Sequence, residues 1–127
     1  MKVDKHIINW LNLSLVVVFL MILIGGITRL TDSGLSITTW KPVTGIFPPM
    51  NQEEWKVSFD EYKEFPEYKV YNSQMSLKEY KSIYFWEYLH RMIGRLIGIL
   101  FIIPFSFFYF KKYIKKENTY KFFILLI

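Results

Sequence analysis

The chain has 127 residues, of which 52% are hydrophobic, 20% are aromatic and 21% are charged, and its formal net charge is +5. A soluble chain of this length would form one small domain, but here the charges are segregated from long apolar stretches, as in a small membrane protein. Five lysines in one short connection account for the basic excess, so no nucleic-acid partner is expected. The absence of cysteine excludes disulfides, thiolate metal sites and thiol nucleophiles.

The first apolar stretch covers about residues 7–27. About 20 residues rising 1.5 Å each match a hydrocarbon core of about 30 Å, so this stretch predicts a membrane span. A cleaved signal peptide is the alternative. The stretch is long for a signal sequence, and Gly25–Arg29 lacks a small-x-small cleavage site, so we expect an uncleaved span.

Residues 28–82 form a long polar connection. Its first part carries Gly34, Gly45 and Pro48-Pro49, which predict an ordered loop with at most one helical turn. The capping box Asn51–Glu54 then starts a short amphipathic helix that stops near Pro66. Its aromatic face either lies on the membrane surface or packs against the loop's own residues, and the sequence leaves both open.

A second capping box, Ser76–Glu79, starts a helix that runs into a second span at about residues 84–110. Pro104 is expected to kink this span rather than end it. A lysine-rich turn follows at residues 111–121, and residues 122–127 look like the start of a third span. Six apolar residues cannot cross a bilayer, so we expect the front part of a longer protein.

The lysines also predict the orientation of the chain. The turn at 111–121 holds five lysines and one glutamate, whereas the connection at 28–82 holds seven basic and eight acidic residues. The positive-inside rule therefore places the turn and the N-terminus in the cytoplasm and residues 28–82 outside.

The second span begins with a polar stripe. At about 100° per residue, its members share one helical sector about 140° wide; they are Glu87, His90, Arg91, Gly94, Arg95 and Gly98. Polar groups at membrane depth are costly, so this stripe is expected to face a cavity, a partner helix or a bound group.

The stripe residues each allow more than one role. His90 could ligate a metal or haem iron, relay protons or make a structural hydrogen bond, and Gly94 one turn away would leave room for a flat macrocycle. Glu87 could pair with Arg91 at i, i+4 or stand as a carboxylate beside a bound group. The second histidine of the chain, His6, is expected to be solvated at the cytoplasmic end.

The arginine side chains also allow more than one role. Arg91 and Arg95 could snorkel or pair, but guanidinium forks also suit the two propionates of a haem. Arg29, at the outer end of the first span, could serve the same anionic edge or simply anchor the helix at the interface.

Several motifs together resemble haem A synthase of the proteobacterial and mitochondrial type. They occur in order at family spacing: Gly25–Ser36, Trp40–Gly45, Pro48-Pro49 and Glu87–Arg91 with Gly94-Arg95. The cysteine pair that other members carry in the first outer loop is absent here.

The resemblance implies an eight-span protein of two four-helix halves, each with two haem-ligating histidines. Such a protein oxidises a ring methyl of its substrate haem O to a formyl, giving haem A for cytochrome oxidase, and holds a haem b cofactor in its C-terminal half. By motif, His90 is the first axial ligand to haem iron and Glu87 is the catalytic acidic residue. Arg29, Arg91, Gly94 and Arg95 are then the expected haem-binding residues.

The chain departs from this family by carrying one of four expected histidines and two of eight spans. We therefore expect a partial four-helix-bundle half that is not competent alone and needs the missing spans or another protomer. The expected setting is the bacterial inner membrane, since no mitochondrial transit peptide is seen, with the bilayer, haem O synthase and electron donors as partners. A small b-type haem protein ligated by His90, or a non-enzymatic membrane hairpin, remains the alternative.

Overall fold

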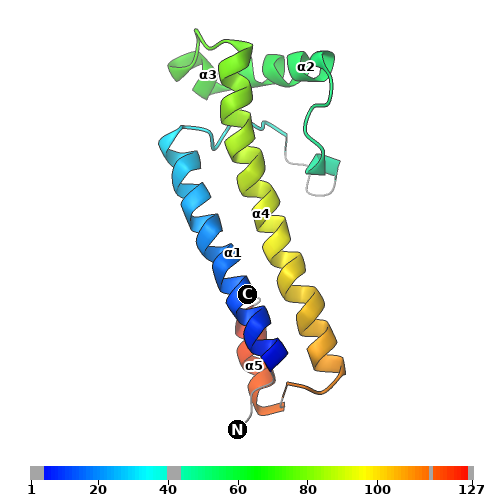
Figure 1. Cartoon of the computed structure of the whole chain (residues 1–127). Helices are drawn as coiled ribbons and strands as arrows, with labels where there is room; N and C mark the ends of the chain where they lie inside the picture. Colours follow the sequence, from blue (N-terminus) through cyan, green and yellow to red (C-terminus); the bar gives the residue numbers. More distant parts are fainter. Residues whose placement is uncertain (1–4, 40–43, 115, 126–127) are drawn as a thin grey trace. The chain divides into compact units, whose positions relative to one another are not determined.

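The computed structural model describes residues 5–39, 44–114 and 116–125. These residues form helices and no strand (Figure 1); the helices are α1 (Lys5–Leu30), the short 3₁₀ turn η1 (Thr44–Ile46), α2 (Gln52–Lys63), α3 (Pro66–Tyr71), α4 (Leu77–Phe110) and α5 (Lys116–Ile124). The all-α prediction is confirmed. So are the two apolar segments, since α1 and α4 are long and apolar enough to cross a membrane.

Two compact units divide the chain, and both long helices contribute to each. The first unit comprises Met1–Met21 and Ile93–Ile127, and the second comprises Ile22–Met92. Each unit has its own cluster of buried aromatic side chains.

In the first unit, the buried cluster is built around Trp10 of α1. Its indole packs against Phe101 and Phe108 of α4 at centroid distances of 5.3 and 5.5 Å, and it stacks on Phe122 of α5 at 5.8 Å. Figure 1 shows α5 beside the first turns of α1. These contacts explain why the short α5 is held, since a helix of nine residues is marginal in isolation.

Pro104 lies inside α4 without ending it, as the sequence predicts. Proline has no N–H, so the carbonyl of Leu100, four residues earlier, loses its usual helical donor. The indole N–H of Trp10 donates to this same carbonyl at 2.8 Å. The tryptophan thus supplies the hydrogen bond that the proline removes, and it joins α1 to α4 at this point.

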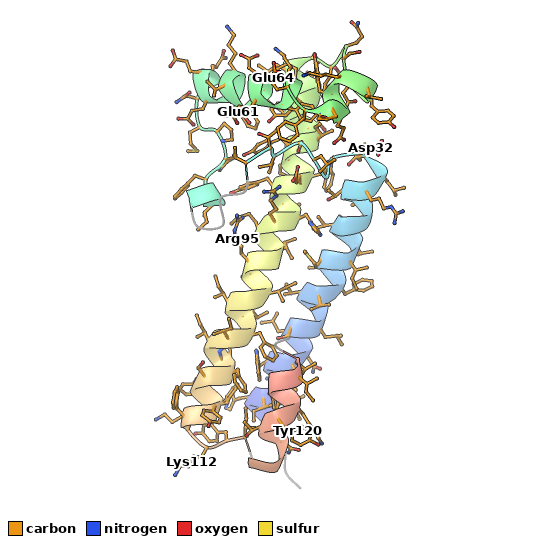
Figure 2. All side chains as sticks on the ribbon, turned by 180° about the vertical axis from the view of Figure 1, so that it is seen from behind. Asp32, Glu61, Glu64, Arg95, Lys112 and Tyr120 are labelled. Carbon is orange, nitrogen blue, oxygen red and sulfur yellow. The ribbon has the colours of Figure 1, made fainter. Side chains whose placement is uncertain are left out.

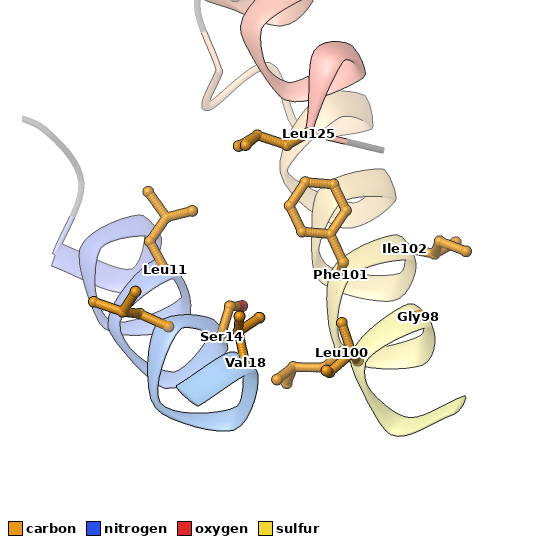
Figure 3. A pocket seen from close by; sticks show the side chains of 10 residues that line it. Leu11, Ser14, Val18, Gly98, Leu100, Phe101, Ile102 and Leu125 are labelled. Carbon is orange, nitrogen blue, oxygen red and sulfur yellow. The ribbon is translucent and has the colours of Figure 1, made fainter. Parts of the chain in front are cut away.

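The first unit also contains an apolar pocket of about 420 Å³ between α1 and α4 (Figure 3). Its wall includes Leu11, Val18, Leu100 and Phe101. Ser14 is the polar side chain on this wall, and its hydroxyl already donates to the Trp10 carbonyl at 2.9 Å. The lining therefore offers apolar contact and no titratable group.

In the second unit, the aromatic face of α2 packs on the first turns of α4. Phe59 and Tyr62 of α2 are buried together with Tyr80, Ile83 and Tyr84 of α4. Figure 1 shows α2 and α3 beside this part of α4, and Figure 2 shows the charged Glu61 on α2 and Glu64 just after its end. Of the two arrangements left open by the sequence, the structure has the aromatic face packed within the protein.

Both capping boxes are present. Asn51 accepts a hydrogen bond from the Glu54 amide at 2.8 Å, while the Glu54 carboxylate accepts from the Met50 amide at 2.7 Å. The Ser76 amide and hydroxyl donate to the Glu79 carboxylate at 2.8 and 2.7 Å. These bonds satisfy amide donors at the starts of α2 and α4.

The C-terminal ends of α1 and α4 share one backbone geometry. Asp32 and Lys112 have φ values of 49° and 57°, and each lies just beyond its helix (Figure 2). The amide of the next residue then reaches back, from Ser33 to the Thr28 carbonyl at 2.9 Å and from Tyr113 to the Phe108 carbonyl at 3.0 Å. This is the Schellman arrangement, which usually has glycine at the left-handed position.

Two helix boundaries differ from the sequence expectations. Pro66, expected only to stop a helix, is the first residue of the additional helix α3, because proline suits a position where the amide has no helical partner. The predicted turn at 111–121 is shorter, since α5 already begins at Lys116 rather than near Phe122.

The hydrogen bond between Trp10 and Leu100 predicts that the cost of replacing Trp10 depends on the residue at position 104. Trp10→Phe should destabilise the protein by about 1–3 kcal/mol, because it leaves a partly buried carbonyl without a donor. In a Pro104→Ala background the loss should fall by about 1 kcal/mol, since the new amide can bond to Leu100. Thermal unfolding in detergent measures this cycle.

Ser106→Ala provides the matched background for that cycle. Its hydroxyl donates to the Ile102 carbonyl and has no part in the Leu100 bond. Trp10→Phe should therefore cost the same with and without Ser106→Ala. An equal cost in the Pro104→Ala background would contradict the proposed compensation.

Glu67 of α3 predicts a specific pH dependence. One of its carboxylate oxygens is buried without a hydrogen-bond partner among the described residues, and burial raises the pKa of Glu67, with Asp32 and Glu87 adding to the effect. A raised pKa in the folded state means that stability is lost as the pH rises through that pKa. Glu67→Gln should therefore raise the melting temperature at pH 7 and have little effect near pH 4.

The control for Glu67 is Glu64→Gln, because that side chain is largely exposed and pairs only loosely with Lys69. It should change the melting temperature little at either pH. A Glu67→Gln protein that is no more stable than the parent at pH 7 would show that the buried charge carries no cost.

Candidate functional site

The second unit contains an open pocket of about 480 Å³ lined by charged residues. Its wall is built from the last turns of α1, the following turn and the middle of α4; the lining residues are Gly25, Thr28, Arg29, Gly34, Glu87, His90 and Arg91. Arg29, Glu87, His90 and Arg91 are all site residues predicted from the sequence, and the fold brings them together at one pocket.

The carboxylate of Glu87 is the most completely bonded group at this pocket. The residue is 3% exposed. One oxygen accepts from the Ser36 hydroxyl and from the Ile37 amide, both at 2.7 Å. The other accepts from Nε of Arg91 at 3.0 Å and also from its Nη2. Glu87 thus holds the segment after α1 against α4.

Arg91 completes the same arrangement from α4. Its Nη2 also donates to the Ile37 carbonyl at 3.1 Å, so both backbone groups of Ile37 are bound by the ion pair. The structure therefore contains the i, i+4 pair of Glu87 with Arg91 that the sequence offered as one alternative. A catalytic part for Glu87 stays a prediction.

His90 lies one helical turn from Glu87 and lines the pocket. Its imidazole has no hydrogen-bond partner within the part of the chain that the structure describes. The Nε2 edge faces α1, where a Cβ built on Gly25 would lie 3.2 Å from Nε2 and 3.5 Å from Cδ2. Because the imidazole makes no hydrogen bond within the described residues, its nitrogens are available to ligate a metal or to form a hydrogen bond.

Thr28 holds α1 and α4 together beside these residues. Its hydroxyl lies 2.8 Å from the Ile24 carbonyl and 3.4 Å from the Trp86 carbonyl, and the side chain is 6% exposed. Arg29, the next residue, is exposed and brings a positive charge to the pocket wall. No ion pair of Arg29 occurs among residues 5–39, 44–114 and 116–125.

The side chains present here do not form a site for a free metal ion. Over the described residues, no three His, Asp or Glu side chains gather closely enough to bind one. A single histidine suits instead a metal that arrives with most of its ligands, such as an iron held by a macrocycle. His90 is the residue that could complete such a coordination sphere.

Gly94 and Arg95, also predicted as site residues, belong to the first unit. A Cβ on Gly94 would lie 3.4 Å from the terminal methyl of Met21, so this glycine faces α1. Arg95 is partly buried. Their contact with a haem stays a prediction.

Sequence reasoning assigned no role to Gly25, Thr28, Ser36 or Ile37. Small and polar residues follow one another from Gly25 to Ser36, and this interruption at the end of an apolar helix was the available signal. What the sequence could not supply was the partner of each residue, since Ser36 and Glu87 are 51 positions apart.

Comparison with known proteins identifies relatives of the chain. A family described as cytochrome oxidase assembly protein matches residues 8–127. The heme A synthases of Flavobacterium psychrophilum and Caulobacter sp. strain K31 are 50% and 48% identical to it, over 99% and 97% of the chain. The heme A synthase of Rickettsia bellii is 47% identical over 98% of the chain.

The chain spans 36–38% of the length of these relatives. No solved structure matches it. The family match nevertheless covers α4, all of α1 from residue 8 onward and every residue that lines the charged pocket. The chain therefore belongs to the cytochrome oxidase assembly protein family, and it is a membrane protein of that family.

Proposed function

We propose that this chain forms the haem O-binding part of a haem A synthase, with His90 as an axial ligand to the substrate's iron. The whole enzyme would oxidise a ring methyl of haem O to a formyl and so give haem A for cytochrome oxidase. The observation that carries the proposal is the imidazole of His90, which lines a charged pocket without a hydrogen-bond partner among the described residues. The overall likeness of the chain to heme A synthases supports it.

The chemistry of the pocket fits a haem. Neutral imidazole is a good ligand for haem iron, and His90 lines the pocket. A haem also carries two propionates, which guanidinium groups bind well. Arg29 is suited to this role because it lies on the pocket wall and its charge is not neutralised by an acidic partner in the described residues.

In this proposal the main role of Glu87 is structural. Its carboxylate accepts from the Ser36 hydroxyl and the Ile37 amide and so holds this segment beside α4; Gly34 of the same segment lines the pocket. A part for Glu87 in accepting a proton from the substrate would need at least one of these bonds to open. Arg91 is then mainly the counter-charge of Glu87 and a weaker candidate than Arg29 for a propionate.

We further propose that the pocket lies near the outer face of a bacterial inner membrane. The lysine-rich residues 111–121 belong on the cytoplasmic side by the positive-inside rule, together with the N-terminus. Residues 28–82 would then lie outside, and Glu87 and His90 would lie close to that face. A second axial ligand and the haem b site would come from other spans or another protomer, with haem O synthase supplying the substrate.

The ligand assignment is tested in a chimera in which this chain replaces the matching part of the Rickettsia bellii heme A synthase. His90→Ala should abolish haem A formation in a host that lacks its own enzyme, because the iron loses an axial ligand. Haem extraction and chromatography measure the product. The reduced-minus-oxidised absorption spectrum of the purified chimera should change as well.

His6→Ala is the matched control, since His6 is the other histidine of the chain and lies at the start of α1. It should leave haem A content and spectrum unchanged. A His90→Ala chimera that makes as much haem A as His6→Ala would refute the assignment of His90.

The Glu87 arrangement predicts a local loss of protection. Glu87→Ala should speed hydrogen exchange at the Ile37 amide, because that amide then lacks its acceptor. It should also destabilise the protein by about 3 kcal/mol, since it leaves the Arg91 charge without a partner. Adding Arg91→Leu should recover part of this loss.

Glu61→Ala is the comparison for Glu87, because Glu61 is exposed on α2 and its carboxylate accepts a long bond of 3.4 Å from Thr38. It should leave exchange at Ile37 unchanged. Equal exchange at Ile37 in the parent and Glu87→Ala proteins would show that the carboxylate does not hold this segment.

A further inference from the structure

We infer that Gly25 is a positioning residue for His90: its lack of a side chain sets where the imidazole stands between α1 and α4. The inference deepens the proposed function, on which its connection to haem rests. The geometry itself involves only residues of the second unit and no bound group.

The distances show how little room the ring has. A Cβ on Gly25 would stand 3.2 Å from Nε2 of His90, closer than side-chain carbons usually approach other atoms. The neighbouring ring atom Cδ2 would be at an ordinary contact distance of 3.5 Å. Even one methyl group at position 25 would therefore push the Nε2 edge away by a few tenths of an ångström. Nε2 is one of the two atoms through which a histidine can ligate iron.

The two helices have limited freedom to separate in response. Thr28, one turn after Gly25, lies within 3.4 Å of the Trp86 carbonyl, which is one turn before His90. The bonds from Ser36 and Ile37 to Glu87 fix the segment after α1 to the same part of α4. Because these contacts hold the end of α1 and the segment after it against α4, we expect the imidazole to move rather than the helices.

The neighbouring Gly26 does not share this steric constraint. A Cβ on Gly26 would have no neighbour within 4 Å, and the residue is exposed. Alanine favours a helix interior over glycine, so Gly26→Ala should stabilise α1. Gly25→Ala brings the same gain in helix preference but meets the histidine. The pair of substitutions therefore isolates the contact from the backbone effect.

Nuclear magnetic resonance of the chain with isotope-labelled histidine, in lipid nanodiscs, tests the inference directly. The chain has two histidines, so His6→Gln assigns both sets of ring signals. We expect Gly25→Ala to shift the ring signals of His90 and leave those of His6 in place. Gly26→Ala should shift neither. A His90 shift no larger in Gly25→Ala than in Gly26→Ala would overturn the inference.

Thermal unfolding gives a second measurement, which can still be made if Gly25→Ala is too unstable for nuclear magnetic resonance. In a His90→Ala background, Gly25→Ala should raise the melting temperature as Gly26→Ala does, because the obstructing ring is gone. In the parent background Gly25→Ala should give a smaller rise or a fall. If Gly25→Ala lowers the melting temperature equally in both backgrounds, the strain lies elsewhere and the inference is wrong.

Neither measurement uses haem, so each can fail or succeed independently of the proposed function. In the chimera, Gly25→Ala should lower the haem bound per protein relative to Gly26→Ala. Shifted His90 signals with unchanged haem content would uphold the steric role of Gly25 and remove its connection to haem binding. Loss of haem A in His90→Ala tests the proposed function separately.

Discussion

The second unit depends on one partly buried ion pair that is shared with the backbone. Glu87 and Arg91 lie one turn apart on α4, and together they bind the amide and the carbonyl of Ile37 and the hydroxyl of Ser36. A buried carboxylate is costly unless each oxygen is compensated, and here each oxygen accepts two bonds. Glu87 and Arg91 of the polar stripe therefore provide hydrogen-bond partners for the backbone of Ile37, in an irregular segment where these groups would otherwise be unpaired.

The same principle governs the first unit, with different residues. Pro104 removes a helical donor inside an apolar stretch, and the Trp10 indole replaces it at the Leu100 carbonyl. At this position the cost of an unpaired carbonyl is avoided by a side chain from another helix. The aromatic packing around Trp10 then brings α5 into the same cluster. In both units, a local break in regular hydrogen bonding is used to join segments far apart in the sequence.

Sequence patterns predicted the features that depend on neighbouring residues. Hydrophobic length located α1 and α4, and Asn51 and Ser76 were recognised as caps because capping is set within four residues. The start of α3 at Pro66 was missed, since proline both ends and begins helices. The role of Glu87 stayed undecided because Ser36 and Ile37, some 50 residues away, complete its environment.

The charge balance of the pocket follows from that environment. Arg91 is neutralised by Glu87, whereas Arg29 has no acidic partner in the described part of the chain, so the uncompensated positive charge on the pocket wall is carried by Arg29. An anionic group entering beside His90 would therefore be attracted toward the end of α1 rather than toward the stripe on α4. Under the proposed function, the helix pair would divide the recognition of a haem, with the proposed iron ligand His90 on α4 and the proposed propionate partner Arg29 on α1.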